Sequence, residues 1–145
     1  MRHKILPILL GIGVFVIDQA LKFLAVTNPQ AHWYAIKPWL GWEYFPNPGI
    51  AFSLPIPNLA VIALTPAIIF LIGWWWLRQP GKKNWTAASL VLAGALSNFL
   101  DRLRLEITID YLRIFYSVIN LADIAIVLGI AWIIFSWGRT TSPEV

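Results

Sequence analysis

The sequence predicts an all-α membrane protein, a bundle of four transmembrane helices with a small extracytoplasmic sheet. Three observations support this fold class. Of the 145 residues, 59% are hydrophobic and only 12% are charged, which is beyond the balance of a soluble domain. The apolar residues form four long runs, each near the ~20 residues that cross the hydrocarbon as a helix. A segment rich in proline and aromatic residues separates the first two runs.

The four expected spans cover residues 5–26, 59–77, 85–103 and 118–137. The first run contains Asp18 and Lys22 and is too long for the apolar core of an ordinary signal peptide, so we interpret it as a retained helix. No internal repeat is visible. Four spans within 145 residues therefore predict a single integral-membrane domain covering 1–145.

The basic residues predict how the bundle is oriented, because lysine and arginine accumulate on the cytoplasmic side. Four spans put both termini on one side of the membrane. The terminal side carries Arg2, Lys4, Arg78, Lys82, Lys83 and Arg139, and the opposite side carries Lys37, Arg102, Arg104 and Arg113. This bias favours cytoplasmic termini and places residues 27–58 and about 104–117 outside.

The first outer segment contains three short runs typical of strands, "WYAI", "WEYF" and "IAFSL", separated by proline and glycine. Its tryptophans and tyrosines suit a membrane interface. We expect a small, irregular sheet on the outer leaflet. Asn47, in "NPG", could be only a turn residue of this segment.

Costly polar residues gather at the outer level of the predicted bundle, although the chain order scatters them. Exposing an ionisable side chain to lipid costs roughly 2.5–3.5 kcal/mol on insertion scales, so several of these residues must share a pocket. The set comprises Asp18, Lys22, Asn47, Asn98, Asp101, Arg102, Asp110, Asn120 and Asp123.

Several of these residues also have a structural interpretation. Asp18 and Lys22 lie one helical turn apart, where an ion pair would neutralise both and tie the first helix to the bundle. Asp101 and Arg102 could form a helix-end pair, or the arginine could extend to the interface, as readily as either could contact a substrate. Gly94, in "LAGAL", is most simply a close contact between helices.

The composition excludes several other chemistries. The chain has no cysteine, and His3 and His32 lack a second ligand at metal spacing, so we expect no metal and no cofactor. The net charge of +4 speaks to topology and anionic lipid, and no basic run with interleaved aromatic residues suggests nucleic-acid binding.

Asp110 and Asp123 are harder to explain as structural residues. Asp123 has no lysine or arginine three or four positions away, so its partner must come from elsewhere, and Asp110 is the nearest acidic candidate. If the two carboxyl groups meet in a desolvated pocket, they share a proton and titrate as a unit. One can then activate a water while the other donates a proton to an amide carbonyl, which is the chemistry of an aspartyl endopeptidase.

Two other classes of protein remain open from the residues alone. A small proton-coupled transporter would need polar residues on both sides of the midplane, and the inner half of the predicted bundle has almost none. A structural membrane subunit would tolerate asparagine at Asp110 or Asp123, whereas a protease needs a titratable group at both. A serine protease is disfavoured, because Ser53, Ser89 and Ser97 have no lysine or histidine at their own depth.

Four blocks of this sequence resemble the lipoprotein signal peptidase family, also called signal peptidase II, of the bacterial inner membrane. "DQALK" resembles the family's D-x-x-x-K, and "NPGIAFSL" resembles N-x-G-x-A-F. "GALSNFLDRL" is similar to G-A-x-G-N-x-x-D-R and is followed by "ITIDY", like V-V-D-F, while "INLAD" is similar to F-N-x-A-D. The blocks occur in the family's order over nearly the whole chain.

The resemblance implies an aspartyl endopeptidase that removes the signal peptide from diacylglyceryl-modified prolipoproteins, on the amino side of the lipobox cysteine. It implies that Asp110 and Asp123 form the catalytic dyad. It also implies pocket-lining or dyad-ordering roles for Asn47, Asn98, Arg102 and Asn120, and polar support from Asp18, Lys22 and Asp101.

The family's fold is a four-helix membrane bundle with a β-cradle and a short outer helical element near the active site. Prolipoprotein, membrane lipid and a globomycin-like inhibitor are the implied partners. Ser97, Tyr111 and Ile119 depart mildly from the motifs, where glycine or phenylalanine is usual. Asp110 and Asp123 are also close together in the chain for this family, so we expect the outer helical element to be reduced to little more than a turn.

Overall fold

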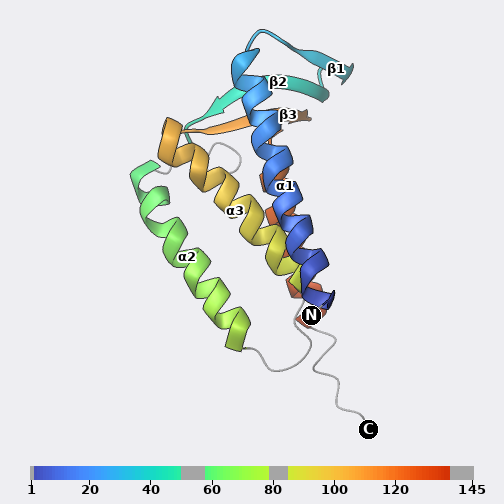
Figure 1. Ribbon diagram of the computed structural model, residues 1–145. Coiled ribbons are helices and arrows are strands. Elements are labelled where there is room, and N and C mark those ends of the chain that lie inside the picture. The colour runs from blue at the N-terminus through green and yellow to red at the C-terminus, as the bar shows by residue number, and fades with distance from the viewer. Residues whose placement is uncertain (1, 50–57, 79–84, 138–145) are drawn as a thin grey trace.

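A computed structural model shows a bundle of helices with a small sheet across one end (Figure 1). The structure describes residues 2–49, 58–78 and 85–137. The helices are α1 (Arg2–Thr27), α2 (Asn58–Arg78), α3 (Trp85–Leu105) and α4 (Leu121–Trp137). The strands are β1 (Trp33–Ile36), β2 (Leu40–Asn47), β3 (Thr108–Ile114) and β4 (Ser117–Ile119).

The four helices overlap the four apolar runs of the sequence, although α1 begins three residues earlier and α4 three residues later than expected. The last run was expected to become helical at residue 118, but the helix begins at Leu121 because Ser117–Ile119 pairs with β3 as strand β4. The Asn120 side-chain oxygen accepts the Asp123 backbone N–H at 2.8 Å, and Asp123 Oδ2 accepts the Asn120 N–H at 3.5 Å. This reciprocal cap starts the helix at its observed position.

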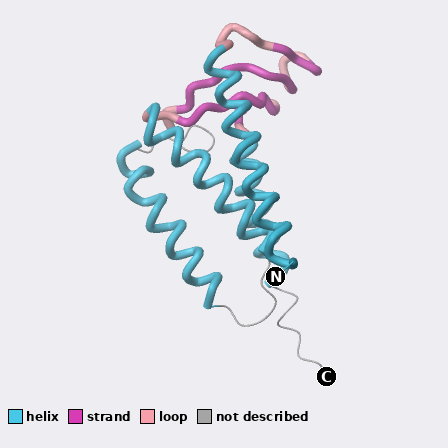
Figure 2. The backbone as a smooth tube through the Cα atoms, in the orientation of Figure 1, coloured by secondary structure: helices cyan, strands magenta, loops and turns pink. Residues whose placement is uncertain are grey.

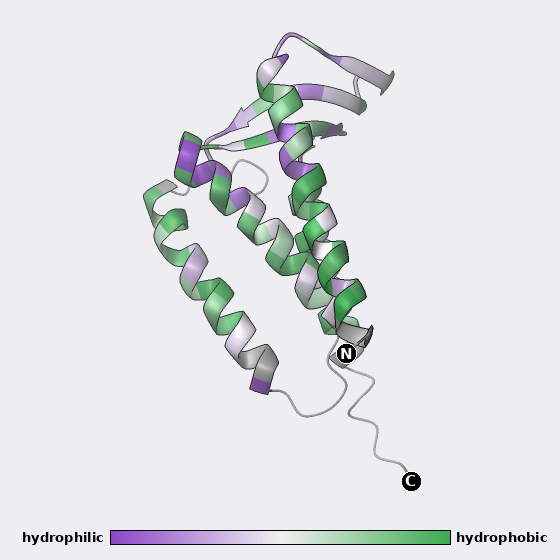
Figure 3. Cartoon of the chain, viewed as in Figure 1, coloured by the Kyte–Doolittle hydropathy of each residue, from purple (hydrophilic) through white to green (hydrophobic). Residues whose placement is uncertain are grey.

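Only one helix among the described residues is long and apolar enough to cross a membrane by itself. It is the Ile5–Thr27 part of α1, with a mean hydropathy of 1.9. Leu59–Trp74 and Leu121–Ser136 form shorter apolar helices. The helices nevertheless direct many large apolar side chains outward, such as Leu6 at 74% exposed and Phe135 at 75%. Figure 3 shows the hydrophobic residues along the helices and the hydrophilic residues concentrated toward the sheet.

The sheet is antiparallel, with the strand order β1-β2-β3-β4, and covers one end of the bundle (Figure 2). The expected strands "WYAI" and "WEYF" are confirmed as β1 and part of β2, while "IAFSL" lies outside the described residues. The central pair joins distant parts of the chain, since Phe45 lies opposite Asp110 and Asn47 lies opposite Thr108. Residues 106–120 contain no helix, and the two-residue turn Phe115–Tyr116 joins β3 to β4.

A small apolar core joins the sheet to the bundle. It contains Ala25 of α1 with Ile109 and Tyr111 of β3, and each is at most 1% exposed. The Trp42 ring lies 5.0 Å from the Tyr111 ring, centroid to centroid, and extends the core along β2. The sheet is therefore held on the end of α1 by packing as well as by its connections.

Helix α3 is the centre of the bundle and packs against both α1 and α4. The approach to α4 is close at Gly94, where an added Cβ would lie 2.4 Å from the Ala122 carbonyl oxygen. A glycine on one helix and an alanine on the other allow the two backbones to approach in this way.

We therefore expect Gly94→Ala to lower the free energy of unfolding by about 1–3 kcal/mol, because the added methyl group must push α3 away from α4. Thermal unfolding in detergent would measure this as a lower Tm. Gly13→Ala is the matched control, since a Cβ at Gly13 meets nothing within 4 Å. Equal Tm values for the two variants would contradict the close contact.

Candidate active site

Buried polar side chains from α1, β2, α3 and β3, together with Asn120 directly before α4, meet where the sheet joins the bundle. The polar residues that the sequence expected to share a pocket are thus brought together, although they are scattered along the chain. The buried set is Asp18, Lys22, Asn47, Ser97, Asn98, Asp101, Arg102, Thr108, Asp110 and Asn120. Asp123 lies beside them and is partly exposed.

Lys22 is the positive charge at the centre of this cluster. Its Nζ lies 2.8 Å from Asp18 Oδ2, 2.8 Å from Asp101 Oδ2 and 2.8 Å from Asn98 Oδ1. The side chain is only 3% exposed, so its charge depends on these partners for compensation. Lys22 thereby joins α1 to α3 through the Asp101 carboxylate and the Asn98 amide, while Asp18 is a partner on its own helix.

Asp18 joins α1 to three other elements. It accepts hydrogen bonds from Ser97 Oγ at 2.6 Å, from the Tyr111 hydroxyl at 2.7 Å and from the Ala122 backbone N–H at 3.1 Å. Burial, together with the charge of Asp18, raises the pKa of Tyr111, so its phenol keeps the proton that it donates. Asp18 therefore fixes α3, β3 and α4 relative to α1.

Asp101 holds the beginning of β3 against α3. Its Oδ2 accepts the Ile109 backbone N–H at 3.2 Å, in addition to its ion pair with Lys22. Gln19 Nε2 donates to Asp101 Oδ1 at 3.0 Å. The hydrogen bond from the Ile109 N–H to Asp101 fixes the position of the residue directly before Asp110.

Asp110 is enclosed by two asparagines. Asn47 Nδ2 donates to its Oδ2 at 2.8 Å, and Asn120 Nδ2 donates to its Oδ1 at 2.6 Å. The residue is 1% exposed. Desolvation raises the pKa of Asp110 to about 7, and the charge of Asp123 adds to this effect, while the Asn47 and Asn120 hydrogen bonds oppose it. Asp110 can therefore gain or lose a proton near neutral pH.

Asp123 occupies the first turn of α4, next to Asp110 through their shared partner Asn120. Its Oδ1 accepts a hydrogen bond of 2.7 Å from Asn98 Nδ2. Its backbone N–H donates to Asn120 Oδ1, while the Nδ2 of the same amide donates to Asp110. One asparagine side chain thus bridges the two acidic residues.

Each asparagine side chain of the cluster has its oxygen next to a group that can only donate a hydrogen bond, and this fixes the orientation of the amide. Asn98 turns its oxygen to the Lys22 ammonium, Asn120 turns its oxygen to the Asp123 N–H, and Asn47 turns its oxygen to the Gly49 N–H at 3.0 Å. In each case the amide nitrogen is left to face a carboxylate. The cluster therefore presents N–H donors to both Asp110 and Asp123.

A cavity of about 280 Å³ reaches the cluster from the side, between α2, α3 and α4. Its walls are apolar except for Thr65 and, where the cavity meets the cluster, Asn98, Arg102 and Asp123. The Arg102 guanidinium donates to the Gly49 carbonyl at 2.9 Å and so holds the chain that follows β2. Of the two acidic residues, Asp123 is the one that lines this cavity.

Sequence reasoning did not identify Gln19, Ser97 and Tyr111 as parts of this cluster. Gln19 Nε2 donates to Ser97 Oγ at 2.8 Å, and Ser97 and Tyr111 both donate to Asp18. Tyr111 stood out only as a departure from the family motifs. Ser97 was also expected to have no lysine at its own depth, which was wrong, because Lys22 Nζ donates to Ser97 Oγ at 3.4 Å. The hydroxyl groups of Ser97 and Tyr111, absent from glycine and phenylalanine, are the signal that could have identified them.

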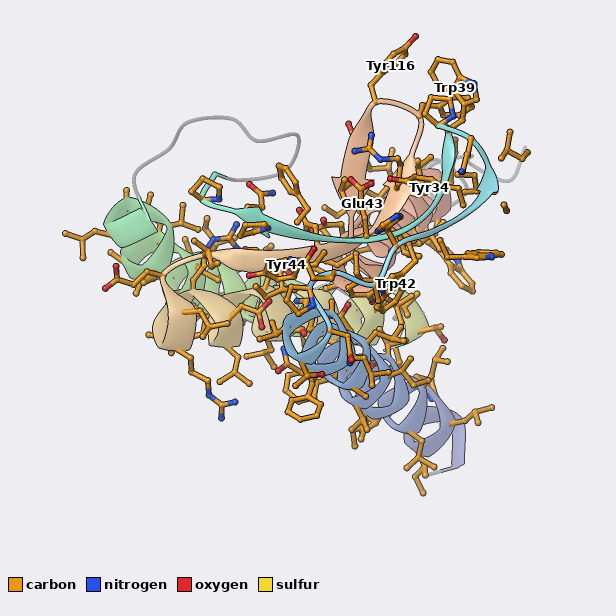
Figure 4. The ribbon with its side chains drawn as sticks, turned by 90° about the horizontal axis from the view of Figure 1, so that it is seen from above. Tyr34, Trp39, Trp42, Glu43, Tyr44 and Tyr116 are labelled. Atoms are coloured by element: carbon orange, nitrogen blue, oxygen red, sulfur yellow. The ribbon has the colours of Figure 1, made fainter. Side chains whose placement is uncertain are left out.

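A second charged group lies on the sheet, outside this cluster. Glu43 of β2 accepts from Arg113 of β3 and, at 2.5 Å, from the Tyr34 hydroxyl of β1 (Figure 4). The Arg113 hydrogen bonds lower the pKa of Glu43, and Glu43 raises the pKa of Tyr34. These contacts connect three strands side by side. Among the described residues, no group of three or more histidine, cysteine or acidic side chains could hold a metal ion.

A polar cluster with paired acidic residues, at one end of a bundle with apolar outer surfaces, defines a small helical membrane enzyme. Solved structures support that class. One, described as a bacterial membrane enzyme, superposes with a TM-score of 0.83 at 25% identity, over 96% of this chain and 93% of its own. A second has the same fold, with a TM-score of 0.76 at 23% identity over 90% of this chain.

The chain belongs to the signal peptidase (SPase) II family, whose model matches residues 10–138. It is similar to the lipoprotein signal peptidase of Moorella thermoacetica, with 35% identity over 90% of this chain and 89% of the relative. It is also similar to the lipoprotein signal peptidase of Bartonella tribocorum, with 33% identity over 96% and 90%. The family resemblance inferred from the four sequence blocks is thereby confirmed.

We expect Lys22→Met to lower the free energy of unfolding by about 3–5 kcal/mol, because it leaves the Asp18 and Asp101 carboxylates buried without their common counter-charge. A lower Tm in detergent would report this loss. Lys37→Met is the control, because Lys37 is exposed on the sheet and should change stability by no more than about 0.5 kcal/mol. Similar Tm values for both variants would show that Lys22 is not the compensating charge.

Proposed function

We propose that this chain is an aspartyl endopeptidase of the signal peptidase II type, with Asp110 and Asp123 as its catalytic pair. Family membership carries the general activity, the removal of signal peptides from prolipoproteins. The arrangement of the two acidic residues supports the assignment of the pair. They come from different elements, share Asn120, and differ in environment, one enclosed and one at the cavity.

The two environments support a division of roles. Asp110, with a pKa raised to about 7, carries the shared proton, and Asp123 at the cavity acts first as the base. Asp123 takes a proton from a water whose oxygen adds to the scissile carbonyl carbon, while Asp110 gives its proton to the carbonyl oxygen. In the second step Asp123 gives its proton to the amide nitrogen and Asp110 recovers one from the tetrahedral intermediate. The C–N bond then breaks.

We further propose that all four helices cross the bacterial inner membrane, with both termini cytoplasmic and the sheet at the outer face. The outward-facing apolar side chains along the helices and the position of the sheet across one end support this topology (Figure 3). The polar cluster then lies near the outer membrane surface, where water reaches it. A scissile bond just outside the hydrocarbon would meet the cluster at that level.

The cavity between α2, α3 and α4 supports the proposed substrate class. Its apolar walls suit acyl chains, and its polar end at Asn98, Arg102 and Asp123 suits the peptide next to them. A diacylglyceryl prolipoprotein offers both parts, and it can enter sideways from the membrane. Cleavage would occur on the amino side of the modified cysteine, and a globomycin-like inhibitor would compete for this cavity.

We expect Asp110→Asn and Asp123→Asn each to reduce cleavage of a diacylglyceryl prolipoprotein by at least about 10²-fold, because each removes a proton donor or acceptor. A gel-shift assay on purified protein with EDTA present would measure it. Glu106→Gln, at an exposed acid between α3 and β3, should retain activity. Turnover by a folded Asp123→Asn variant would refute the assignment, and a transporter or structural subunit would cleave nothing.

The raised pKa of Asp110 predicts an alkaline limit to activity. As the pH rises through about 7, Asp110 loses the proton that it must donate, so kcat should fall by about tenfold per pH unit. The Asn47 hydrogen bond lowers this pKa, so Asn47→Leu should move the limit to higher pH. A kcat–pH profile of each protein would measure the shift. A limit that stays in place or moves to lower pH would argue against Asp110 as the acid.

A further inference from the structure

Two turns of the sheet meet at one end and bring apolar side chains together. The Trp39 ring lies 5.2 Å from the Tyr116 ring and 6.3 Å from the Phe115 ring, centroid to centroid. The Phe115 backbone N–H donates to the Trp39 carbonyl at 2.6 Å, so the two turns are also joined through their backbones. We call this group the aromatic tip. It consists of Ile36, Trp39, Leu40, Ile114, Phe115 and Tyr116, which together line a shallow hollow.

The aromatic tip is exposed although it is apolar. Tyr116 is 86% exposed, Phe115 is 65% and Ile36 is 59%. Burial among the described residues therefore does not account for these side chains. A contiguous exposed apolar group of this kind marks a surface that meets another phase or another molecule.

The backbone conformation of the turn adds a second unfavourable feature, because Phe115 has a positive φ. Phe115 has a φ of 53°, and it is the first of the two residues that connect β3 to β4. Glycine is the usual residue for a positive φ at this position of a two-residue turn, because a side chain is strained there. The turn itself does not require an aromatic residue.

The aromatic tip lies to one side of the helices, at the end of the bundle that the sheet covers. Seen along the bundle in Figure 4, Trp39 and Tyr116 lie together at one edge of the sheet, beyond the helices. Only β4 and Asn120 separate Tyr116 from the first residue of α4, which limits that distance to about 17 Å. Helix α4 carries exposed apolar side chains such as Val127 and Leu128. The tip therefore lies near the start of a helix that has exposed apolar side chains.

We propose that the aromatic tip inserts into the outer leaflet of the bilayer, at the boundary between headgroups and acyl chains. Tryptophan, tyrosine and phenylalanine suit this boundary, and the exposed Lys37 next to Trp39 suits lipid phosphate. The insertion holds the far end of β3, the strand that carries Asp110, at a constant depth. The insertion rests on the proposed topology, and this consequence for Asp110 rests in addition on the proposed catalytic pair.

The lack of cysteine in the chain allows a direct test. A nitroxide is attached at Tyr116→Cys and, as the control, at Gln30→Cys in the exposed connection between α1 and β1. Each full-length protein is placed in vesicles of phosphatidylethanolamine and phosphatidylglycerol without substrate. The collision rates of the nitroxide with oxygen and with a water-soluble nickel chelate then report its depth. We expect nickel accessibility at position 116 to be several-fold lower than at position 30, with higher oxygen accessibility.

Three results would overturn the proposal. The nitroxide at position 116 could be as accessible to nickel as the one at position 30. Its protection could arise only when prolipoprotein is added, which would make the tip a peptide-docking surface. Protection could also vanish when the protein is diluted in lipid, which would indicate contact between copies of the chain. Because none of these readings requires cleavage, failure of the proposed catalytic pair would leave them unchanged.

A second variant separates insertion from folding. Phe115→Gly with Tyr116→Ser removes the aromatic rings and the strain at Phe115, so the Tm in detergent should stay the same or rise. A nitroxide at Ile36→Cys should become several-fold more accessible to nickel in this background than with the native turn. An unchanged accessibility, with an unchanged Tm, would show that the two rings do not hold the tip in lipid.

Discussion

The buried ammonium of Lys22 is the interaction on which the rest of the site depends. A lysine can only donate hydrogen bonds, so each of its three close partners must be an acceptor. Two are carboxylates that compensate the charge, and they reach α3, α4 and β3 through their other contacts. The third is the oxygen of Asn98, whose nitrogen is thereby directed to Asp123. One charge thus links the helices and also sets the donor that faces an acidic residue.

The pairing of β2 with β3 positions Asp110, which no helix carries. It brings Asn47 against Asp110 across a long separation in the chain and covers that carboxyl from water. Asp123, at the start of α4, stays at the edge of the cavity. Two chemically identical groups are thus placed in unlike environments, the condition under which one holds a proton while the other acts as a base. Asn120 fixes the positions of the two residues relative to each other, because it forms a hydrogen bond with each of them.

Much of the fold and of the candidate site could be predicted from the sequence, because lipid imposes simple rules. Apolar runs become helices, and scattered polar residues converge on one level because they are costly elsewhere. The start of α4 was wrong by three residues. "NLAD" contains the capping pair Asn120 and Asp123, but periodicity does not distinguish the preceding strand from a helical turn. Gln19, Ser97 and Tyr111 were not assigned to the cluster because a single polar group in an apolar run does not reveal its partner.

The sequence by itself determined the class of protein, the number of helices, the family and the residues that had to share a pocket, because these depend on composition and local order. Only the tertiary structure decided which partner each polar group has, since hydrogen bonds depend on distances between segments far apart in the chain. It alone brought Trp39 beside Tyr116 and left Asp110 enclosed while Asp123 borders a cavity. Burial is a property of the assembled elements, and no single segment contains it.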